Sequence, residues 1–525
     1  MLPSSVWLPL TVQMNATRPL PAEPALERGA LATLAEQLAA FYAERILAGA
    51  LAAGARLPSV RDAARRHALA PSTVVAAYDL LQAQGLVEAR QHRGFFVRLA
   101  LPAAPRSPRG RDAPPRSAPP HDVTTLMRGM FEHQRGKAPS PGTGTLPPDW
   151  LDLPLLHSAL RRAMSEDTLD PASLRYGEPA GDARLRAALS LRLGQLGIAA
   201  APQQIVTTAG ATHALDLVSR LLLAPGDTVL VDEPGWAVEF ARLTQMGVKL
   251  APVPRGPAGP DLAVMRRLLQ SNAKPRVYIT VSVLHNPTGA TLALAAAHEL
   301  LKLAEAHELT IVEDDTYAWL APLQAPRLAA LDQLQRTVYV SGFSKILTPS
   351  WRVGFLAASP ALVERVIDRK LLTALATPAL PERALAITLE QGTLRRHAER
   401  VVTRLNAARQ RCVRLAEEAG FSFAAPPQGL FGWVETGVDV DRLAGHLHAQ
   451  GWLLAPGSLF HAVPRPSTLM RINFATSQDA KLWRALREAR DGLRGTANRG
   501  AAPKARAAYH RRTTNGNEAA SPELT

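Results

Sequence analysis

The sequence predicts a multidomain protein: a small α+β domain, a linker, and a large α/β domain that ends in a smaller α+β subdomain. The 525 residues are too many for one compact core. A stretch rich in proline and arginine begins at residue 99 and divides the chain. Beyond it, apolar runs of strand length alternate with longer helical segments, a pattern typical of a mostly parallel sheet with helices on both faces.

Composition narrows the class of protein further. Apolar residues make up 47% of the chain, which is enough for large buried cores. The single cysteine, Cys412, excludes an internal disulfide and a cysteine-based zinc site; it predicts a cytoplasmic protein, and we expect no metal site. No apolar run reaches the roughly 18 residues of a membrane helix, and the start MLPSSVWLPL lacks the features of a secretory signal. The net charge of +15 favours a polyanionic partner.

Changes in composition set the domain boundaries. Residues 1–28 are expected to form a disordered arm, although Met14 is a second candidate for the start of translation. Residues 29–98 form the small domain and 99–122 the linker, whose sequence LPAAPRSPRGRDAPPRSAPP has no apolar periodicity. The large domain covers 123–495, and the tail 496–525 lacks a core-forming pattern and is expected to be disordered.

Three helices and a hairpin are predicted within the small domain. LAEQLAAFYAERI starts at Leu34 and carries apolar residues at helical spacing. Ser59 is a candidate N-cap for a second helix, Ser72 for a third, and Gly85 ends the third. EARQHRGFFV, up to Val97, has the pattern of two strands joined by a tight basic turn. This order is that of a winged helix-turn-helix, in which the third helix enters the major groove of DNA.

The segments LPSVRD, STVVAAYDLL, QGLVEAR and RGFFV resemble the GntR family of bacterial regulators. The resemblance implies double-stranded operator DNA as a partner. It also implies DNA contacts from Arg61 at the backbone, Ser72 and Thr73 at the groove, and Arg90, Arg93 and Gly94 in the wing. Pro71 and Ala76 stand where the family often has arginines. Either the wing therefore supplies specificity, or DNA binding is weaker than usual.

The large domain carries segments with polar or glycine residues next to predicted strands. TTAGATHALDL places Gly210, Ala211 and Thr212 at a helix start, where backbone N–H groups can hold a phosphate. The other candidates follow or lie on predicted strands: Asn286 in SVLHNPTG, Asp314 and Tyr317 in IVEDDTYAWL, Lys345 and Arg352 in VSGFSKILTPSWRVGF, and Arg471 in LMRINFA.

Together these segments resemble the fold-type I aminotransferases, which bind pyridoxal 5′-phosphate (PLP). The resemblance implies that Lys345 forms the Schiff base with the cofactor aldehyde, and that Asp314 holds the ring nitrogen protonated. Tyr317 completes the implied catalytic residues. The remaining implied contacts are Asn286 and Tyr317 to the phenolic oxygen, Arg352, Ala211, Thr212 and Ser344 to the phosphate, Trp236 to the ring face, Tyr176 to the phosphate of the partner subunit, and Arg471 to a substrate or effector carboxylate.

One position departs from this family. Gly342 stands three residues before Lys345, where the enzymes often have a phosphate-binding serine or threonine. Ser341 and Ser344 flank it, so phosphate anchoring is expected to be shifted or slightly weaker.

A GntR-like head joined through a proline-rich linker to an aminotransferase-like body is the layout of the MocR regulators. The resemblance implies a PLP-dependent transcriptional regulator, a homodimer whose body senses an amino acid, an amine or PLP itself. The alternative is an active PLP-dependent aminotransferase with a weak or vestigial DNA-binding head, because the catalytic set is complete. Residual transaminase activity is compatible with the regulator as well.

Overall fold

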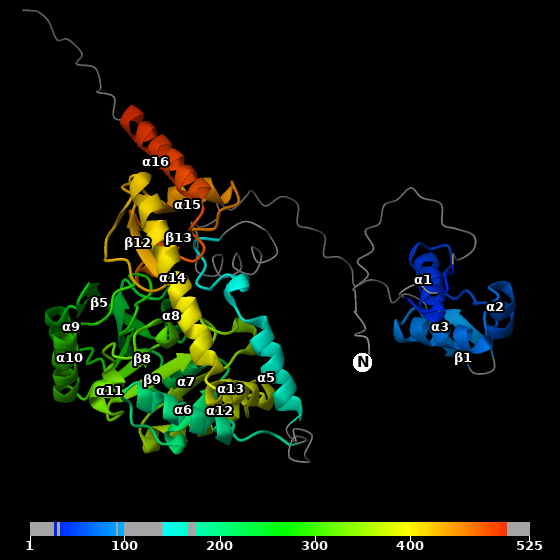
Figure 1. Cartoon of the computed structure of the whole chain (residues 1–525), viewed down its shortest axis with the longest axis horizontal. Coiled ribbons are helices and arrows are strands. Elements are labelled where there is room, and N and C mark those ends of the chain that lie inside the picture. Colours follow the sequence, from blue (N-terminus) through cyan, green and yellow to red (C-terminus); the bar gives the residue numbers. More distant parts are fainter. Residues whose placement is uncertain (1–25, 29–31, 91–92, 99–139, 166–174, 501–525) are drawn as a thin grey trace, which may run out of the picture. The chain divides into compact units, whose positions relative to one another are not determined.

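The computed structural model describes residues 26–28, 32–90, 93–98, 140–165 and 175–500, the last six as backbone only (Figure 1). Most of the expected arm, all of the expected linker and the tail beyond 500 lie outside these residues. The chain separates into two compact units, Met1–Ser117 and Ala118–Thr525. Each unit is described by itself.

The N-terminal unit holds three helices and a hairpin, as predicted. The helices are α1 (Leu34–Leu47), α2 (Val60–Arg66) and α3 (Pro71–Ala83), and the hairpin pairs β1 (Val87–Arg90) with β2 (Gly94–Val97) in antiparallel register. Ser59 caps α2 by accepting a hydrogen bond from the Asp62 N–H, as predicted. The predicted cap at Ser72 is wrong, since the N-cap is Ala70, two residues earlier, and Pro71 is the first residue of α3. Proline suits that position because its fixed φ is already helical.

Aromatic side chains hold this small core together. Tyr78 of α3 is fully buried, and its hydroxyl donates to the Pro58 carbonyl at 2.9 Å. Its ring packs edge-on against Tyr42 of α1 and Phe95 of β2, with centroids 5.9 and 4.9 Å apart. These contacts fix the third helix against both the first helix and the wing.

The C-terminal unit is built on an eight-stranded sheet of order β3-β10-β9-β8-β7-β4-β5-β6. The five strands β9, β8, β7, β4 and β5 run parallel, whereas β10 pairs antiparallel with β3 and β9, and β6 with β5. The bounds are β3 Ile205–Thr208, β4 Thr228–Glu233, β5 Lys249–Gly256, β6 Gly259–Pro260, β7 Val277–Thr280, β8 Thr310–Asp314, β9 Thr337–Gly342 and β10 Gly354–Ala357. The predicted mostly parallel sheet is confirmed.

Helices cover both faces of this sheet. Alternate residues of each strand face opposite ways, so Val338 and Val340 of β9 pack into one core and Tyr339 into another. The helices of the body are α5 (Leu153–Ser165), α6 (Ala183–Gln195), α7 (Ala211–Leu222), α8 (Ala237–Gln245), α9 (Leu262–Leu269), α10 (Leu294–Ala306), α11 (Leu328–Asp332), α12 (Pro360–Thr373) and α13 (Ala379–Glu390). Helices α7, α8 and α12 cover the face of Val338, and α9 and α10 the opposite face.

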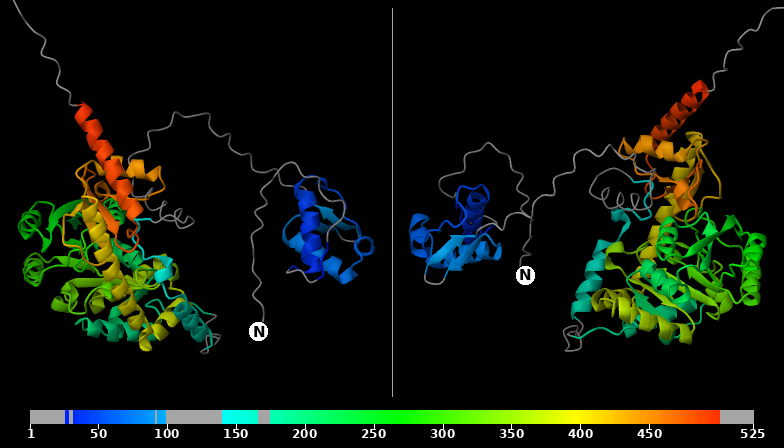
Figure 2. Two further views of the ribbon diagram at one scale, coloured as in Figure 1. Left: turned by 45° about the horizontal axis from the view of Figure 1, so that its top comes forward. Right: turned by 180° about the vertical axis from the view of Figure 1, so that it is seen from behind.

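A smaller α+β subdomain follows, as predicted. The long helix α14 (Thr393–Glu418) runs from the body into it (Figure 2). Its sheet has the order β11-β12-β14-β13, with bounds Ser422–Phe423, Phe431–Glu435, Leu469–Asn473 and Ala455–Pro456. Helices α15 (Val440–His448) and α16 (Ala480–Gly500) complete it, and α16 extends past the boundary expected at residue 495. In the described part of the chain, no helix has the length and apolar character needed to cross a bilayer.

Candidate functional site

The polar side chains singled out in the sequence converge at the carboxyl edge of the parallel strands. Asp314 is the last residue of β8, Lys345 follows β9, and Asn286 lies in the loop after β7. Because parallel strands point the same way, their carboxyl ends meet at one edge of the sheet, where ligands bind in open α/β folds. Arg471 reaches the same place from β14 of the small subdomain, and its Nη1 donates to Asn286 Oδ1 at 3.0 Å.

The Lys345 amine is partly buried, and its Nζ donates a hydrogen bond to the Gly144 carbonyl at 2.9 Å. Burial lowers the pKa of this amine to about 8, with the Arg471 guanidinium acting in the same direction and the Asp314 carboxylate opposing it. The neutral amine is the nucleophilic form. A larger fraction of this amine than of an ordinary lysine is therefore neutral near pH 7.

Asp314 is buried beside this amine. Its carboxylate accepts hydrogen bonds from the backbone N–H of Thr316 at 3.0 Å and from the Thr316 hydroxyl. Burial raises the pKa of Asp314 to about 6, the Thr316 bonds oppose this, and the carboxylates of Glu239 and Asp315 add to it. A carboxyl group in this setting gains most by pairing with a cation brought into the site.

Arg471 is buried with part of its guanidinium free. Its Nη2 donates to the Gly142 carbonyl at 2.6 Å, while Nε has no partner among the described residues. The guanidinium lies over the rings of Phe431 and Phe460, at 4.5 and 5.1 Å from their centroids. Burial lowers its pKa to about 10. This arrangement suits a planar anion such as a carboxylate, which would supply the missing hydrogen-bond acceptor.

The three predicted aromatic residues differ in placement. Tyr317 is buried, and burial raises the pKa of its hydroxyl while the nearby Arg471 guanidinium and Asn286 side chain oppose this rise. Trp236 is the N-cap of α8 and lines a cavity of about 30 Å³ together with Asp314. Tyr176 is 83% exposed, and no contact between it and Lys345 or Asp314 is found among the described residues.

A candidate anion cradle lies at the N-terminus of α7. Gly210 caps this helix with a φ of 85°, and the Arg352 guanidinium lies beside it. A Cβ on Gly210 would lie 2.5 Å from Arg352 Nη2, so only glycine leaves room for this approach. The first residues of the helix are Ala211 and Thr212. The positive end of the helix and the guanidinium together suit a phosphate group.

The two serine residues near Lys345, Ser341 and Ser344, have different hydrogen-bond partners. Ser341 is buried, and its hydroxyl donates to the Asp315 carbonyl at 2.8 Å, so it is committed to the fold. Ser344 accepts a long hydrogen bond of 3.4 Å from Arg352 Nη1 and lies next to the cradle. Gly342 packs close to the backbone of Ala211: a Cβ at this position would lie 3.5 Å from the Ala211 nitrogen. Of the two serines flanking Gly342, Ser344 is thus the one that faces the cradle.

The sequence did not single out the segment 140–146. The carbonyl of Gly142 accepts from Arg471 and that of Gly144 from Lys345, while Asn473 Nδ2 donates to the carbonyls of Thr143 and Thr145 at 3.2 and 2.7 Å. These contacts use backbone carbonyls, which every residue type carries. The two glycines in SPGTGTL were the only available signal.

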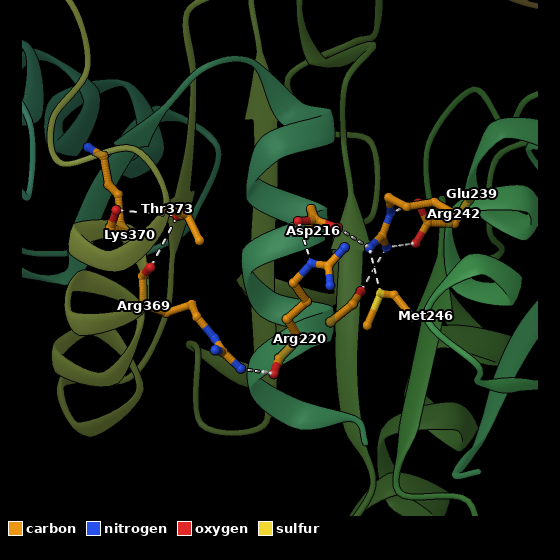
Figure 3. A network of polar contacts seen from close by, with 9 residues as sticks. Asp216, Arg220, Glu239, Arg242, Met246, Arg369, Lys370 and Thr373 are labelled. Carbon is orange, nitrogen blue, oxygen red and sulfur yellow. Dashed lines mark hydrogen bonds and ion pairs between the residues drawn. The ribbon is translucent and has the colours of Figure 1, made fainter. Parts of the chain in front are cut away.

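A polar network supports the cradle from the far end of α7 (Figure 3). Asp216 of α7 pairs with Arg220 at 2.8 Å and with Arg242 of α8 at 3.2 Å. Arg242 also pairs with Glu239, and Arg369 of α12 donates to the Arg220 carbonyl at 2.8 Å. The network ties the helix of the cradle to the helix that begins at Trp236 and to α12.

The predicted DNA contacts lie on the surface of the N-terminal unit. Arg61 at the start of α2, Ser72 in α3, and Arg90 and Arg93 at the hairpin are exposed, and Thr73 is half-buried. Arg90 pairs with Glu88 at 2.8 Å and lies over the Phe96 ring. Gly94 has a φ of 97° and sits against the Arg56 side chain, a cation beside the wing that the sequence did not single out.

Two known families match the two units. Residues 149–488 match aminotransferase class I and II, and residues 34–97 match the gntR family of bacterial regulatory proteins. The uncharacterized HTH-type transcriptional regulator YdcR of Escherichia coli K12 is 30% identical, over 84% of this chain and 94% of its own length. The HTH-type transcriptional regulator TauR of Rhodobacter capsulatus is also 30% identical, over 83% of this chain and 91% of its own. The probable rhizopine catabolism regulatory protein MocR of Rhizobium meliloti is 30% identical over 74% and 77%.

A solved structure resembles the larger unit. It is LysN, the α-aminoadipate aminotransferase of Thermus thermophilus, complexed with N-(5′-phosphopyridoxyl)-L-leucine. It superimposes with a TM-score of 0.64 at 26% identity, over 70% of this chain and 95% of its own.

Proposed function

Because the chain belongs to the aminotransferase class I and II family and, with its gntR-family head, to the MocR-type transcriptional regulators, we propose that it is a PLP-dependent regulator. The head binds operator DNA in the cytoplasm, and the body senses an amino compound. Regulators that match this chain do so across head and body alike, with coverage above four fifths for YdcR and TauR. This supports the regulator over an enzyme with a vestigial head.

The observation that carries the proposal is a set of converging side chains that suits a cofactor, in the same chain as a gntR-family head. PLP, the cofactor of this fold, supplies when bound an aldehyde that condenses with amines and a ring that withdraws electrons. The residues fit it: Lys345 offers a partly neutral amine and Asp314 a buried acid. The cradle of Gly210 and Arg352 suits the phosphate.

We assign the remaining roles by position. Asn286 and Tyr317 orient the phenolic oxygen, and Trp236 covers the ring. Ala211, Thr212 and Ser344 add phosphate contacts. Arg471, with its free Nε, binds the carboxylate of an amino-acid effector.

The segment 140–146 gives this site a route to the head. Lys345 and Arg471 hold the carbonyls of Gly144 and Gly142. An effector carboxylate competes with the Gly142 carbonyl for Arg471, and an effector amine that takes the place of Lys345 at the cofactor aldehyde changes what Lys345 Nζ can bind. In the sequence this segment lies within the body, on the C-terminal side of the proposed linker, so we infer that a change in its contacts alters the tether of the head. Differential affinity for the two arrangements is what lets a ligand shift them.

A second copy of the chain is the proposed partner of an exposed apolar surface. This surface contains Tyr176, Leu371, Leu372, Leu375 and Leu380, which are between 38% and 83% exposed. Gly177 lies against Ala376 and Thr377, which brings Tyr176 to the same region. Apolar groups grouped in this way mark interfaces. In a homodimer, Tyr176 then reaches the phosphate of the partner subunit; sedimentation of Leu372→Glu as a monomer checks the surface.

Transamination is the second candidate activity, favoured by the complete set of Lys345, Asp314 and Tyr317. The test is fluorescence anisotropy of the PLP-loaded full chain with a duplex from upstream of its own gene and a random duplex of equal length. We expect affinity for the upstream duplex higher by about 10³ or more, with binding to both weakened by added salt. Equal affinity for the two duplexes, together with turnover of an amino acid, contradicts the regulator and favours the enzyme.

A further inference from the structure

A second buried carboxylate lies close to Asp314. Glu239 of α8 stands three residues after Trp236 and is only 5% exposed. Glu239, Asp314 and Trp236 line the same cavity of about 30 Å³, enough for roughly one water molecule. The two acids come from different elements, α8 and β8, so their shared cavity is a product of the tertiary fold and not of local sequence.

Arg242 fixes the orientation of this second carboxylate. Its guanidinium pairs with Glu239 at 2.5 Å, with Asp216 at 3.2 Å, and donates to the Ser219 hydroxyl at 2.7 Å (Figure 3). The side chains of Glu239 and Arg242 are 6% and 11% exposed, so solvent screens the pair little. Because Arg242 is buried and also bound to Asp216 and Ser219, it keeps Glu239 in one rotamer.

We propose that Glu239 is a positioning residue that acts through Asp314 on the ring nitrogen of the cofactor. This inference rests on the proposed PLP site. Asp314 lies where it can pair with the ring nitrogen, and Glu239 adds a second negative charge behind it. Two carboxylates around one cation favour its protonated form more than one does. The raised pKa of Asp314, to which the Glu239 carboxylate contributes, is in keeping with this proximity.

Several other titratable groups surround Asp314. Burial lowers the pKa of His285, which lines the same cavity, to about 3, so this ring is neutral above about pH 5. Asp315 is paired with Arg327 at 2.6 Å. Asp232 lines the same cavity, and the Asp314 carboxylate acts on the Lys345 amine, which Arg471 and Arg352 also influence.

The test is a pH titration of the visible absorbance of the PLP-loaded full chain. Glu239→Gln keeps the shape of the side chain and removes its charge. We expect the titration midpoint, which reports protonation at the bond between Lys345 and the cofactor, to fall by about one pH unit. Cofactor affinity should weaken about tenfold, measured by equilibrium titration of the band. Glu239→Asp should restore most of both effects.

Glu299→Gln is the matched control. Glu299 also has its cation three residues later, Lys302 at 3.2 Å, but the pair is exposed on α10. This variant should leave the midpoint and the affinity unchanged. Arg242→Gln removes the opposite charge, and its midpoint should rise.

The proposal is overturned if Glu239→Gln binds PLP with an unchanged midpoint, or if Glu239→Gln and Arg242→Gln both lower it, as general damage would. If Glu239→Gln fails to fold, the direction of the Arg242→Gln shift decides alone. A wild-type chain that develops no visible band with PLP contradicts the proposed function itself, and that result is distinct from the others.

Discussion

The pKa of the Lys345 amine results from several opposing interactions. Burial and the Arg471 guanidinium disfavour the ammonium form, and the Asp314 carboxylate favours it. Burial prevails, because an ammonium ion loses most of its hydration there and the Arg471 and Arg352 guanidinium groups add repulsion. The balance leaves an amine whose pKa is about 8, in contrast to 10.5 for an ordinary lysine.

This value predicts how the rate of cofactor loading depends on pH. Only the neutral amine attacks an aldehyde, so the rate should rise with pH, pass its midpoint near pH 8 and level off above it. Growth of the visible band after mixing apoprotein with PLP between about pH 6.5 and 9.5 measures this. Nα-acetyl-lysine under the same conditions corrects for the titration of PLP itself. A protein rate that still climbs steeply at the upper end of this range contradicts the lowered pKa.

The residues of the site were predictable where the side chain carries the chemistry. Lys345, Asp314, Asn286 and Arg471 each stand in a distinctive sequence segment, and the structure brings them together. The contacts of the carbonyls in segment 140–146 could not be predicted, because every residue type carries a backbone carbonyl and the sequence does not indicate its hydrogen-bond partner. Glu239 was missed for another reason: a glutamate followed three residues later by an arginine usually marks an exposed helix face.

At the scale of elements, the start of α7 depends on close backbone approach. Gly210→Ala places a Cβ 2.5 Å from Arg352 Nη2, so the guanidinium must move away from the cradle. We expect PLP to bind about 10- to 100-fold more weakly, since a charge-assisted contact to phosphate contributes roughly 1.5–3 kcal/mol. Pyridoxal, which lacks the phosphate, should bind as it does to the wild type. Titration of the absorbance band with each compound measures both.

Gly226→Ala is the control that separates the effect of backbone conformation from the effect of the clash with Arg352. Gly226 has a φ of 94°, close to the 85° of Gly210, but nothing lies within 4 Å of its Cβ position. Both variants should lose about 1–2 kcal/mol of stability to the left-handed backbone. Only Gly210→Ala should lose affinity for PLP, and equal loss in both would mean that strain alone is responsible.

Element prediction succeeded where periodicity was strong. The parallel strands β4, β7, β8 and β9 were recognisable as apolar runs buried on both faces. The antiparallel strands β3 and β10 were not singled out, because four residues bounded by turns carry little pattern. The start of α3 was misplaced at Ser72 since a serine is a common cap, whereas Pro71 set the first turn.

At the scale of the whole molecule, the chain joins a gntR-family unit and an aminotransferase-family unit. Coupling between them is a free energy shared by the two binding events. The proposed route runs from Lys345 and Arg471 through the carbonyls of Gly144 and Gly142. It requires the effector carboxylate to contact Arg471.

This coupling predicts a reciprocal effect between DNA and effector. If an amino acid changes the affinity of the PLP-loaded protein for its operator by some factor, the operator must change the affinity for the amino acid by the same factor, about 5- to 150-fold. Anisotropy gives the first factor and absorbance titration the second. Arg471→Lys keeps the charge but cannot bind a carboxylate with two parallel hydrogen bonds. It should reduce both factors together, and a variant that reduces only one would show that the two sites are not thermodynamically linked through Arg471.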